Sequence, residues 1–542
     1  MSCNIAQVIR HWAVAEPHRL ALVTLSADGE SRRELSYGEL ELRVRRAVAR
    51  LRAYGLGVGD RIALSAPNEL AYLDAWFGAL YAGCTVLPVP PMSSPAELAQ
   101  RVQHARCKAL VSSAPQLARG GLAQQALAHC PGVLAIDASS LVGARPESDA
   151  STAAHDDPSL DAPEPMRPES IAMLLYTYGT TGTAKGAMIS HASLGLHTAA
   201  LVHHVLRLGK DDRVLAALPL THSYGIRMTL LAPFYAGACS VLLERFRPER
   251  VRAALADEQI TWFPGVPTMF HALAHEPDAA GQVRFAGPGG HLRWCLSAGA
   301  PLPREVRLRA EAKLGVPLRQ GFGLTEATFS SIATPDDPEG ADTVGRPVFG
   351  VELRIIDEQG RTLATGEAGE VCVRGANVMS GYLDDAAATA EALRDGWLHS
   401  GDIGKLDSAG RLTIVDRIKD MVIRGGFNVY PAEVEAVLVT HPAVRDAVVV
   451  GVPDERYGEE VLAALVLHEG AALALDEFAG FCRAALSRVK LPRLLTRLTE
   501  LPIGASGKVM RREVRRRALA GELTLEPVPA GPAQPTAHSD PH

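Results

Sequence analysis

Several features that mark whole classes of protein are missing from this chain of 542 residues. No apolar run reaches 18 residues, which argues against a membrane-spanning helix. The amino terminus carries Arg10, His11 and Glu16 where a signal peptide would keep a continuous apolar core. We therefore expect a cytoplasmic protein without a membrane span.

Cysteine and net charge are also low. The eight cysteines show no C-x-x-C spacing, which argues against a disulfide framework and against a zinc site. The formal charge is only −6 over the whole length, so neither nucleic acid nor an anionic membrane is expected as a partner. The chain is nevertheless 47% hydrophobic, which is enough for a large core and more than one domain.

Strand-like and helix-like apolar runs alternate through most of the chain. Residues 61–68, 70–83 and 84–90 read as strand, helix and strand, the pattern of an α/β fold. GALYAGCTVLPV (78–89) resembles APFYAGACSVLL (232–243), and each combines a helix end, a glycine and a β-rich run. We predict a large N-terminal domain, residues 1–416, with two similar α/β subdomains and a small β-rich region.

The pattern changes after Gly366, where short alternating strands begin. Pro431 stands where the start of a helix favours proline, and apolar strands follow at 447–452 and 461–469. These signals predict a smaller C-terminal α+β domain over residues 420–520. Residues 521–542 have no helical or strand period and are expected to form a disordered tail.

A run rich in glycine and threonine, YTYGTTGTAKGAMISH, occupies residues 176–191. Its glycines let backbone N–H groups turn inward, its threonines offer hydroxyl groups and Lys185 adds a cation, so the run suits a polyphosphate. It is not a Walker loop, because the spacing G-x-x-x-x-G-K-[ST] is absent. A plain surface turn has a similar composition, so this run alone does not decide between the two.

Four further motifs follow in order: GFGLTEA (321–327), GWLHSGD (396–402), GRLTIVDRIKDMVIRGGFNVYPAEVE (410–435) and LPIGASGKVMRREV (501–514). With the glycine/threonine run they resemble the motif set of the adenylate-forming superfamily, which includes acyl- and aryl-CoA synthetases, peptide-synthetase adenylation domains and luciferases. The motif style is closest to fatty-acyl or aryl CoA ligases. Five motifs in this order are a specific signal for the family, whereas any one of them alone is a weak signal. The resemblance implies an ATP-dependent, AMP-forming ligase that joins a carboxylic acid to a thiol, with a mobile C-terminal domain.

The resemblance places the phosphates of ATP against the glycine/threonine run. Thr325 would bind phosphate, and Glu326 would hold Mg²⁺ because a hard cation prefers carboxylate oxygens. The residues implied around the β- and γ-phosphates are Thr180, Thr181, Gly182, Thr183 and Lys185.

The rest of the nucleotide is assigned in the same way. Phe322, beside Gly321, stands where the family places an aromatic ring against adenine. Asp402 is expected in a turn, where its carboxylate would accept hydrogen bonds from both ribose hydroxyls. Arg417 would contact the ribose and phosphate side. Read alone, these are an ordinary core phenylalanine, a turn aspartate and a surface arginine.

Lys508 follows the small residues of GASG and could reach into a cleft from a flexible arm. The resemblance makes it the cation that bridges the acyl carboxylate and the α-phosphate during adenylation. Lys508 must then move away before the second step. The family hinge corresponds to residues 417–419, with Lys419 as the pivot.

The second nucleophile is less clearly marked. Gly425 and Gly426 lie in a segment that resembles CoA ligases, where the backbone would lie against a pantetheine arm, and a β-turn is compatible with this. Coenzyme A is therefore the expected acceptor, and a separate acyl carrier protein is the alternative. RREVRRR (511–517) would either hold CoA phosphates or form a solvated helix end.

The acid is expected to be small, neutral, and aliphatic or aryl. His222, in LPLTHSYGIRM (218–228), matches the family position beside the substrate carboxylate. Ser223 stands where amino-acid-activating members place an aspartate, so an ammonium group would find no partner there. Arg227 leaves a small opening for a diacid, but an arginine on a helix face explains it equally well. The residues expected to line the acid pocket are Ser223, Val266, Ser297, Ala298 and Gly299.

Two residues depart from the family pattern. Tyr178 replaces the usual small residue of the phosphate loop, and Ala184 replaces the usual proline before Lys185. Loss of that proline loosens the loop and would weaken ATP binding. A second hypothesis is therefore an impaired member that only binds an acyl group or a nucleotide.

Overall fold

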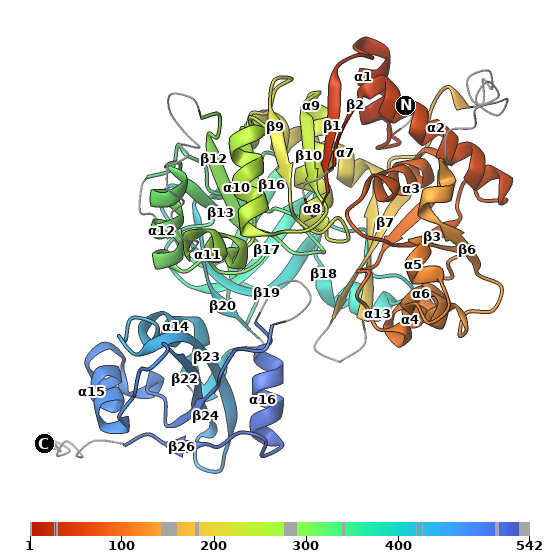
Figure 1. Cartoon of the computed structure of the whole chain (residues 1–542). Coiled ribbons are helices and arrows are strands. Elements are labelled where there is room, and N and C mark those ends of the chain that lie inside the picture. Colours follow the sequence, from red (N-terminus) through yellow and green to blue (C-terminus); the bar gives the residue numbers. More distant parts are fainter. Residues whose placement is uncertain are drawn as a thin grey trace, which may run out of the picture. The chain divides into compact units, whose positions relative to one another are not determined.

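The computed structural model describes residues 3–26, 28, 31–142, 160–178, 184–275, 290–338, 342–418, 420–424, 427–503 and 509–529. The chain forms two compact units, shown with all their elements in Figure 1. The first contains residues 1–354, 372–400 and 408–412, and the second contains 355–371, 401–407 and 413–542. The second unit thus includes three segments that the sequence assigned to the N-terminal domain: 355–371, 401–407 and 413–416.

The first unit contains a six-stranded sheet in the order β6-β5-β3-β4-β7-β8. All neighbouring strands in it are parallel except β7 and β8. The predicted strand, helix and strand over 61–90 are confirmed as β3, α3 (Leu70–Tyr81) and β4. The strands are β3 (Arg61–Ser65), β4 (Thr85–Pro88), β5 (Ala109–Ser112), β6 (Leu134–Asp137), β7 (Ile171–Tyr178) and β8 (Ala184–Ser190).

A nine-stranded sheet in the same unit follows the order β15-β14-β13-β12-β11-β9-β10-β1-β2, with parallel neighbours from β13 to β1. Buried apolar residues of its strands pack against those of α10 (Pro248–Asp257), α11 (Pro267–His275) and α12 (Arg304–Leu314). The strands are β1 (Leu20–Leu25), β2 (Arg32–Ser36), β9 (Arg213–Ala216), β10 (Cys239–Leu243), β11 (Trp262–Gly265), β12 (Trp294–Ala298), β13 (Leu318–Phe322), β14 (Ser331–Ile332) and β15 (Arg346–Pro347).

The internal resemblance predicted from the sequence corresponds to matching structure in the two sheets. Gly83 follows α3 and precedes β4, and Gly237 follows α9 (Ala232–Ala236) and precedes β10. Both glycines adopt a positive φ, 79° and 74° respectively, which a glycine reaches without strain as the helix ends. The two α/β subdomains therefore share this local architecture.

A five-stranded sheet has the order β16-β17-β19-β18, with β20 paired to β19. Its strands are β16 (Val351–Ile356), β17 (Gly369–Gly375), β18 (Leu393–Arg394), β19 (Trp397–Leu406) and β20 (Leu412–Arg417). The short alternating strands expected after Gly366 are present here.

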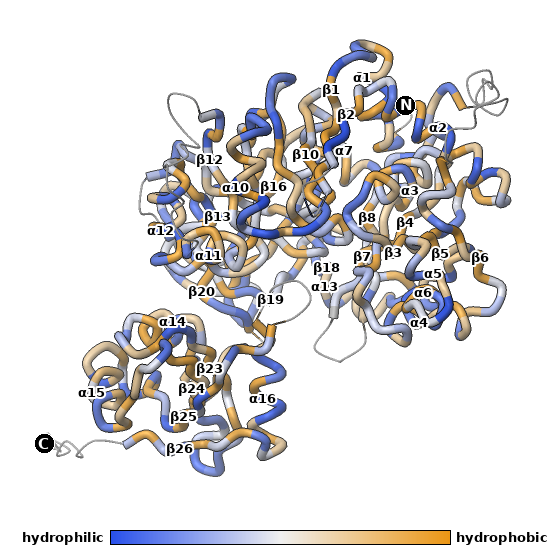
Figure 2. Tube along the Cα trace, viewed as in Figure 1, coloured by the Kyte–Doolittle hydropathy of each residue, from blue (hydrophilic) through white to orange (hydrophobic). Residues whose placement is uncertain are grey.

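The second unit is built on a sheet in the order β22-β21-β24-β25-β26, with β23 paired to β24. Figure 2 shows β23 and β24 as mostly apolar, and their valines and leucines form the core with α14 (Pro431–Leu438) and α15 (Leu475–Ala485). The strands are β21 (Val422–Arg424), β22 (Phe427–Val429), β23 (Val444–Asp454), β24 (Gly458–Leu467), β25 (Leu494–Arg497) and β26 (Glu526–Pro527). The predicted α+β character and the helix start at Pro431 are confirmed.

The prediction of a disordered tail over residues 521–542 is wrong for its first part, residues 521–529. Strand β26 pairs with β25, and Val528 is buried in the core of the second unit. Apolar residues in 521–529 therefore find a place in the fold even though the segment lacks a regular period. Residues 530–542 lie outside the described part of the chain.

Within the described ranges, no helix is both long and apolar enough to cross a lipid bilayer. The eight cysteines all lie in the described ranges and form no disulfide, and seven of them are buried. Burial is usual for free cysteines, which pack as small apolar side chains.

His191 is a buried histidine whose titration should affect stability. The Ile5 N–H donates to its Nδ1 at 3.1 Å, and burial lowers its pKa to about 4. Between about pH 6.5 and 4 the unfolded histidine binds a proton while the folded one does not, so stability falls as the pH falls. We expect a loss of about 3 kcal/mol across this window from His191 alone.

The matched variant is His191→Asn, whose side-chain oxygen can accept the Ile5 N–H but does not titrate. Urea unfolding at pH 7, 5.5 and 4 should show a steeper loss for the natural protein than for the variant. Parallel pH profiles would contradict the assignment.

Candidate active site

The glycine/threonine run joins β7 to β8. These strands pair in antiparallel register, and Thr177 lies opposite Lys185. Thr180, Thr181, Gly182 and Thr183 lie outside the described residues, so their predicted contacts stay predictions. The described ends of the run nevertheless fix where Lys185 stands.

Glu326 lies beside this pair of strands. The hydroxyl groups of Thr177 and Tyr382 donate to its Oε1 at 3.2 and 2.8 Å. The Nζ of Lys185 lies 5.3 Å from the centre of the Tyr382 ring. Glu326 Oε2 accepts no hydrogen bond from the described residues. The structure thus brings Lys185 and Glu326, predicted from two separate motifs, into one site.

Tyr382 is a site residue that the sequence did not reveal. Its segment pairs with β8, where Met188 N–H donates to Gly381 O at 2.9 Å and Leu383 N–H donates to Gly186 O at 2.8 Å. Burial raises the pKa of Tyr382, and the neighbouring Glu326 raises it further, so the phenol stays protonated and donates. No spacing in the sequence marks this tyrosine, because it reaches Glu326 only through the pairing with β8.

The ends of four parallel strands carry the residues predicted for the acid and the adenine. Strands β9, β11, β12 and β13 are neighbours, with Gly265 opposite Ser297 and Ala298 opposite Gly321. Their carboxyl ends therefore lie side by side, which is where α/β sheets bind ligands. The predicted residues at or just after these ends are His222, Ser223, Val266, Ser297, Ala298, Gly299, Gly321, Phe322, Thr325 and Glu326.

Tyr224 connects these strand ends. Its hydroxyl lies 3.0 Å from the carbonyl oxygen of Gly265 and 2.9 Å from that of Leu296. Its ring meets the edge of Phe329, with the centroids 4.9 Å apart. The adjacent Ser223 is thereby held near β11 and β12. Ser297 is 1% exposed, and its hydroxyl has no hydrogen-bond partner among the described residues.

Arg227 lies within the helical segment Ile226–Leu231, as the helix-face interpretation expects, and it is buried there. It is 2% exposed, and its Nη1 donates to the carbonyl oxygens of Ser193 and Leu194 at 3.2 and 3.3 Å. Burial lowers the pKa of Arg227 to about 9. Its Nη1 is therefore engaged with α7 (His191–Ala200), while its Nε has no hydrogen-bond partner among the described residues.

Asp402 and Arg417 lie together in the second unit. The Nε of Arg417 donates to Asp402 Oδ1 at 2.9 Å, from the end of β20 to β19. Asp402 is buried, whereas 43% of the Arg417 side chain is exposed. The turn expected at Gly401 and Asp402 is instead the interior of β19, where Gly401 has a φ of 70°. A glycine tolerates this irregularity inside a strand.

The remaining predicted residues lie outside the described part of the chain: Lys419, Gly425, Gly426 and Lys508. Strands β21 and β22 flank the glycines as an antiparallel pair, with Arg424 opposite Phe427. The predicted β-turn itself falls on the two glycines and stays a prediction.

A cavity of about 160 Å³ lies beside Lys185. It is lined by Gln100, Arg101, His104, Tyr176, Ala184, Lys185, Leu383 and Asp385. Lys185 therefore borders open space, as a residue that contacts a ligand must.

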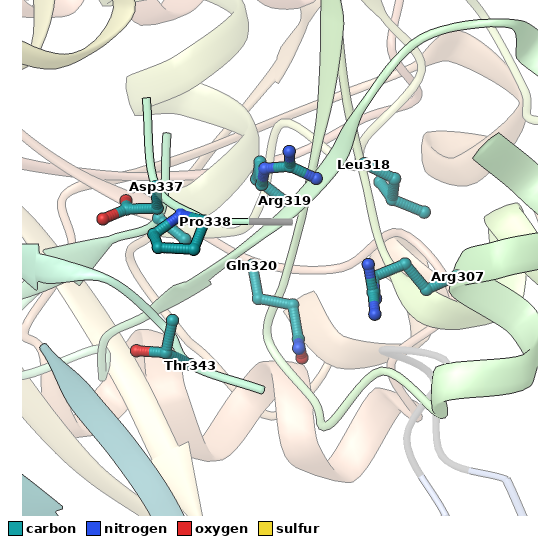
Figure 3. Close-up of a pocket in the computed structure, with 8 residues that line it drawn as sticks. Arg307, Leu318, Arg319, Gln320, Asp337, Pro338 and Thr343 are labelled. Atoms are coloured by element: carbon teal, nitrogen blue, oxygen red, sulfur yellow. The ribbon is translucent and has the colours of Figure 1, made fainter. Parts of the chain in front are cut away.

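A separate recess at β13, shown in Figure 3, does not qualify as a substrate site. Its volume is about 10 Å³, room for about one water molecule. Two of the residues that line it, Arg319 and Arg307, donate to the carboxylate of Glu311 at 2.9 and 3.3 Å.

Two α/β sheets, with Lys185 and Glu326 brought together near the carboxyl ends of parallel strands, form an arrangement suited to binding a phosphorylated ligand. The comparisons with known proteins identify the family. The model of the "AMP-binding enzyme" family matches residues 9–383, and that of the "AMP-binding enzyme C-terminal domain" matches residues 433–508. The chain belongs to the AMP-binding enzyme family.

Individual relatives agree with this assignment. The chain is 35% identical over 486 residues to a feruloyl-CoA synthase of Amycolatopsis sp, covering 89% of this chain and 94% of the relative. It is 34% identical to a long-chain-fatty-acid–CoA ligase of Escherichia coli O157:H7, covering 89% and 90%. ATP-bound MatB from Rhodopseudomonas palustris superposes with a TM-score of 0.85 at 30% identity, covering 95% and 99%.

These comparisons confirm the predicted superfamily, the fold class and the activity of an AMP-forming acid–CoA ligase that uses ATP and CoA. They also agree with a small carboxylic acid as substrate. The domain boundaries and the roles of single residues stay predictions.

Proposed function

We propose that this enzyme activates a neutral aliphatic or aryl carboxylic acid and transfers it to coenzyme A. The observation that carries the proposal is the meeting of Lys185, Thr177, Tyr382 and Glu326 beside the carboxyl ends of β11, β12 and β13. Such a site places phosphate-binding groups next to a pocket for a second substrate.

In the first step, an oxygen of the substrate carboxylate attacks the α-phosphorus of ATP, the bond to the β-phosphate breaks, and pyrophosphate leaves. The carboxylate is already ionised at neutral pH, so no general base is needed. Lys185 and the loop residues 180–183 hold the β- and γ-phosphates, and Thr325 also binds phosphate. Lys508 balances the charge that develops at the α-phosphate.

Mg²⁺ fits the oxygen donors of this site. Thr177 and Tyr382 both donate to Oε1 of Glu326, and Oε2, which accepts no hydrogen bond from the described part of the chain, would be available to a hard cation. When bound, the ion would supply charge neutralisation at the phosphates. The ion pair of Asp402 and Arg417 would contact the ribose. Phe322, beside Gly321, would lie against the adenine.

In the second step, the thiolate of CoA attacks the acyl carbonyl and AMP leaves. A movement at Lys419 would remove Lys508 and bring Gly425 and Gly426 to the pantetheine arm. His222 would lie near the carbonyl. A carrier-protein thiol is the alternative acceptor, and the cytoplasmic location rests on the sequence alone.

The acid class is supported by the side chains at the strand ends. Ser223 provides no anion for an amino acid, and Arg227 is engaged with backbone carbonyls. Val266, Ala298 and Gly299 are apolar. The names of two relatives, a feruloyl-CoA synthase and a long-chain-fatty-acid–CoA ligase, point to the same classes of acid.

The test is a panel of carboxylic acids scored for acid-dependent pyrophosphate release, then repeated with hydroxylamine, with CoA and with a holo carrier protein. We expect fatty or aryl acids to release pyrophosphate, amino acids and diacids to fail, and thioester to form with CoA. If thioester forms only with the carrier protein, the carrier protein rather than CoA is the acceptor. Absence of pyrophosphate release with every acid would favour the impaired, ligand-binding member.

A further inference from the structure

The connection between β13 and β14, residues 323–330, carries Glu326. Its two ends are tied together, because the Ser330 N–H donates to Phe322 O at 2.8 Å. The backbone of Glu326 is held as well, since the Met379 N–H donates to its carbonyl oxygen at 2.7 Å. The direction of the Glu326 carboxylate therefore follows from the shape of this short connection.

Phe329 has an unfavourable backbone conformation within this connection. Its φ is 50°, in the left-handed region that residues with a side chain rarely adopt. The backbone of Phe329 also lies against Gly323, where an added Cβ atom would be 2.2 Å from the Phe329 nitrogen. A residue held in this way costs about 1–3 kcal/mol and persists only where neighbouring groups fix it. The connection thus depends on outside contacts to keep its shape.

Two groups outside the connection fix Phe329. Its ring is buried and meets the ring of Tyr224, with the centroids 4.9 Å apart. Its carbonyl oxygen lies 3.0 Å from Nε2 of His197, a residue of α7 that is 1% exposed. The first contact is apolar packing, and the second is a hydrogen bond that fixes the orientation of the peptide group.

His197 acts at this position as a neutral donor. A carbonyl oxygen only accepts, so the ring proton is assigned to Nε2. Nδ1 has no hydrogen-bond partner among the described residues. Burial lowers the pKa of His197 well below its usual value, and the nearby cation of Arg227 lowers it further. The single proton of the neutral ring is thus directed at the Phe329 carbonyl.

A buried asparagine supports the connection from the segment that also carries Tyr382. Asn377 Nδ2 donates to Ser330 Oγ at 3.1 Å, and this hydroxyl donates to Ala327 O at 3.2 Å. The connection is therefore held from two distant parts of the chain, and His197 acts on the strained residue itself.

We propose that His197 is a positioning residue for adenylation. By donating to the Phe329 carbonyl, it keeps residues 323–330 in the strained shape that places the Glu326 carboxylate beside Thr177 and Tyr382. This inference rests on the proposed role of Glu326 as the ligand of Mg²⁺.

The test compares variants of His197 by acid-dependent ATP–pyrophosphate exchange, titrated with Mg²⁺ at fixed ATP. His197→Leu fills a similar volume but cannot donate, so exchange should fall by about 10-fold or more, the penalty for a misplaced catalytic group. The Mg²⁺ concentration for half-maximal exchange should rise by about threefold or more, because the ligand carboxylate is displaced. A purely structural loss would reduce the amount of active enzyme and leave that concentration unchanged.

Two matched variants accompany His197→Leu. His197→Gln places an amide N–H near the position of Nε2–H and should stay within about threefold of the natural protein. Thr198→Val changes the next residue of α7, which is also buried and whose hydroxyl has no hydrogen-bond partner in the described part of the chain. It should leave both exchange and the Mg²⁺ requirement unchanged.

A double-mutant cycle connects His197 to Glu326. In the Glu326→Gln background, His197→Leu should change exchange by no more than about twofold, because the carboxylate that it positions is gone. If His197→Leu does not fold, His197→Asn takes its place: its shorter amide does not reach the Phe329 carbonyl, so it should raise the Mg²⁺ requirement where His197→Gln does not.

The proposal is overturned if the Mg²⁺ requirement of these variants equals that of the natural protein, or if His197→Gln loses as much exchange as His197→Leu. If Glu326→Gln itself leaves the Mg²⁺ requirement unchanged, the proposed role of Glu326 fails. That outcome differs from a failure of the His197 proposal, in which Glu326→Gln raises the requirement and His197→Leu does not.

Discussion

Replacing Lys508 by alanine should lower adenylation by roughly 10²-fold or more, the scale for one lost preorganised charge contact. The substrate carboxylate and the α-phosphate are both anionic, and their approach builds negative charge that a fixed ammonium group stabilises. The effect should fall on the rate of exchange more than on the binding of ATP, because the contact strengthens in the transition state. Acid-dependent ATP–pyrophosphate exchange measures it directly.

The control for Lys508→Ala is the thioester-forming half-reaction, started from the acyl-adenylate. It should proceed at close to the natural rate, because Lys508 is not needed once AMP is the leaving group. A variant that exchanges pyrophosphate normally would remove Lys508 from the mechanism. A variant that loses both half-reactions equally would point to a folding defect.

Replacing Glu326 by glutamine should reduce kcat/KM for ATP by about 10²-fold and raise the Mg²⁺ concentration needed for half-maximal activity. The glutamine side-chain oxygen can still accept the hydrogen bonds that Thr177 and Tyr382 donate to Oε1. The change therefore removes the charge and the metal-binding character of Oε2 while keeping the shape of the site. Pyrophosphate exchange titrated with Mg²⁺ at fixed ATP is the measurement.

The matched control for Glu326→Gln is Tyr382→Phe. It removes one donor to Oε1, at 2.8 Å, but leaves the carboxylate charged. We expect an unchanged Mg²⁺ dependence, because the carboxylate keeps its charge. The loss in kcat/KM should lie between about 10-fold and about 10²-fold, because a hydrogen bond to a charged group contributes about 1.5–3 kcal/mol. If Glu326→Gln leaves the Mg²⁺ dependence unchanged, Glu326 is not a metal ligand.

The fold was largely predictable because hydrophobic period and glycine positions are local properties of the chain. The run from β3 through α3 to β4 and the glycines at the ends of α3 and α9 follow from neighbouring residues alone. The start of β26 was missed for the same reason. Its two residues gain their place from β25, which is not visible in a short window of sequence.

The site was predictable where the family motifs are contiguous, and less so where distant segments meet. Lys185 and Glu326 were named from separate motifs, and the structure brings them together. Tyr382, 56 residues from Glu326, joins them only through pairing with β8. For Arg227 the sequence left two alternatives, a group for a diacid and a helix-face arginine. Packing against α7 buries this side chain, and no property of residues 218–228 reports that packing.

The pairing of β26 with β25 has a practical consequence for protein engineering. Removing the chain after residue 520 would uncover the outer edge of β25 and empty the position that Val528 fills. Shortened versions, affinity tags and fusion partners should therefore join the molecule beyond residue 529, where the cut leaves that edge covered.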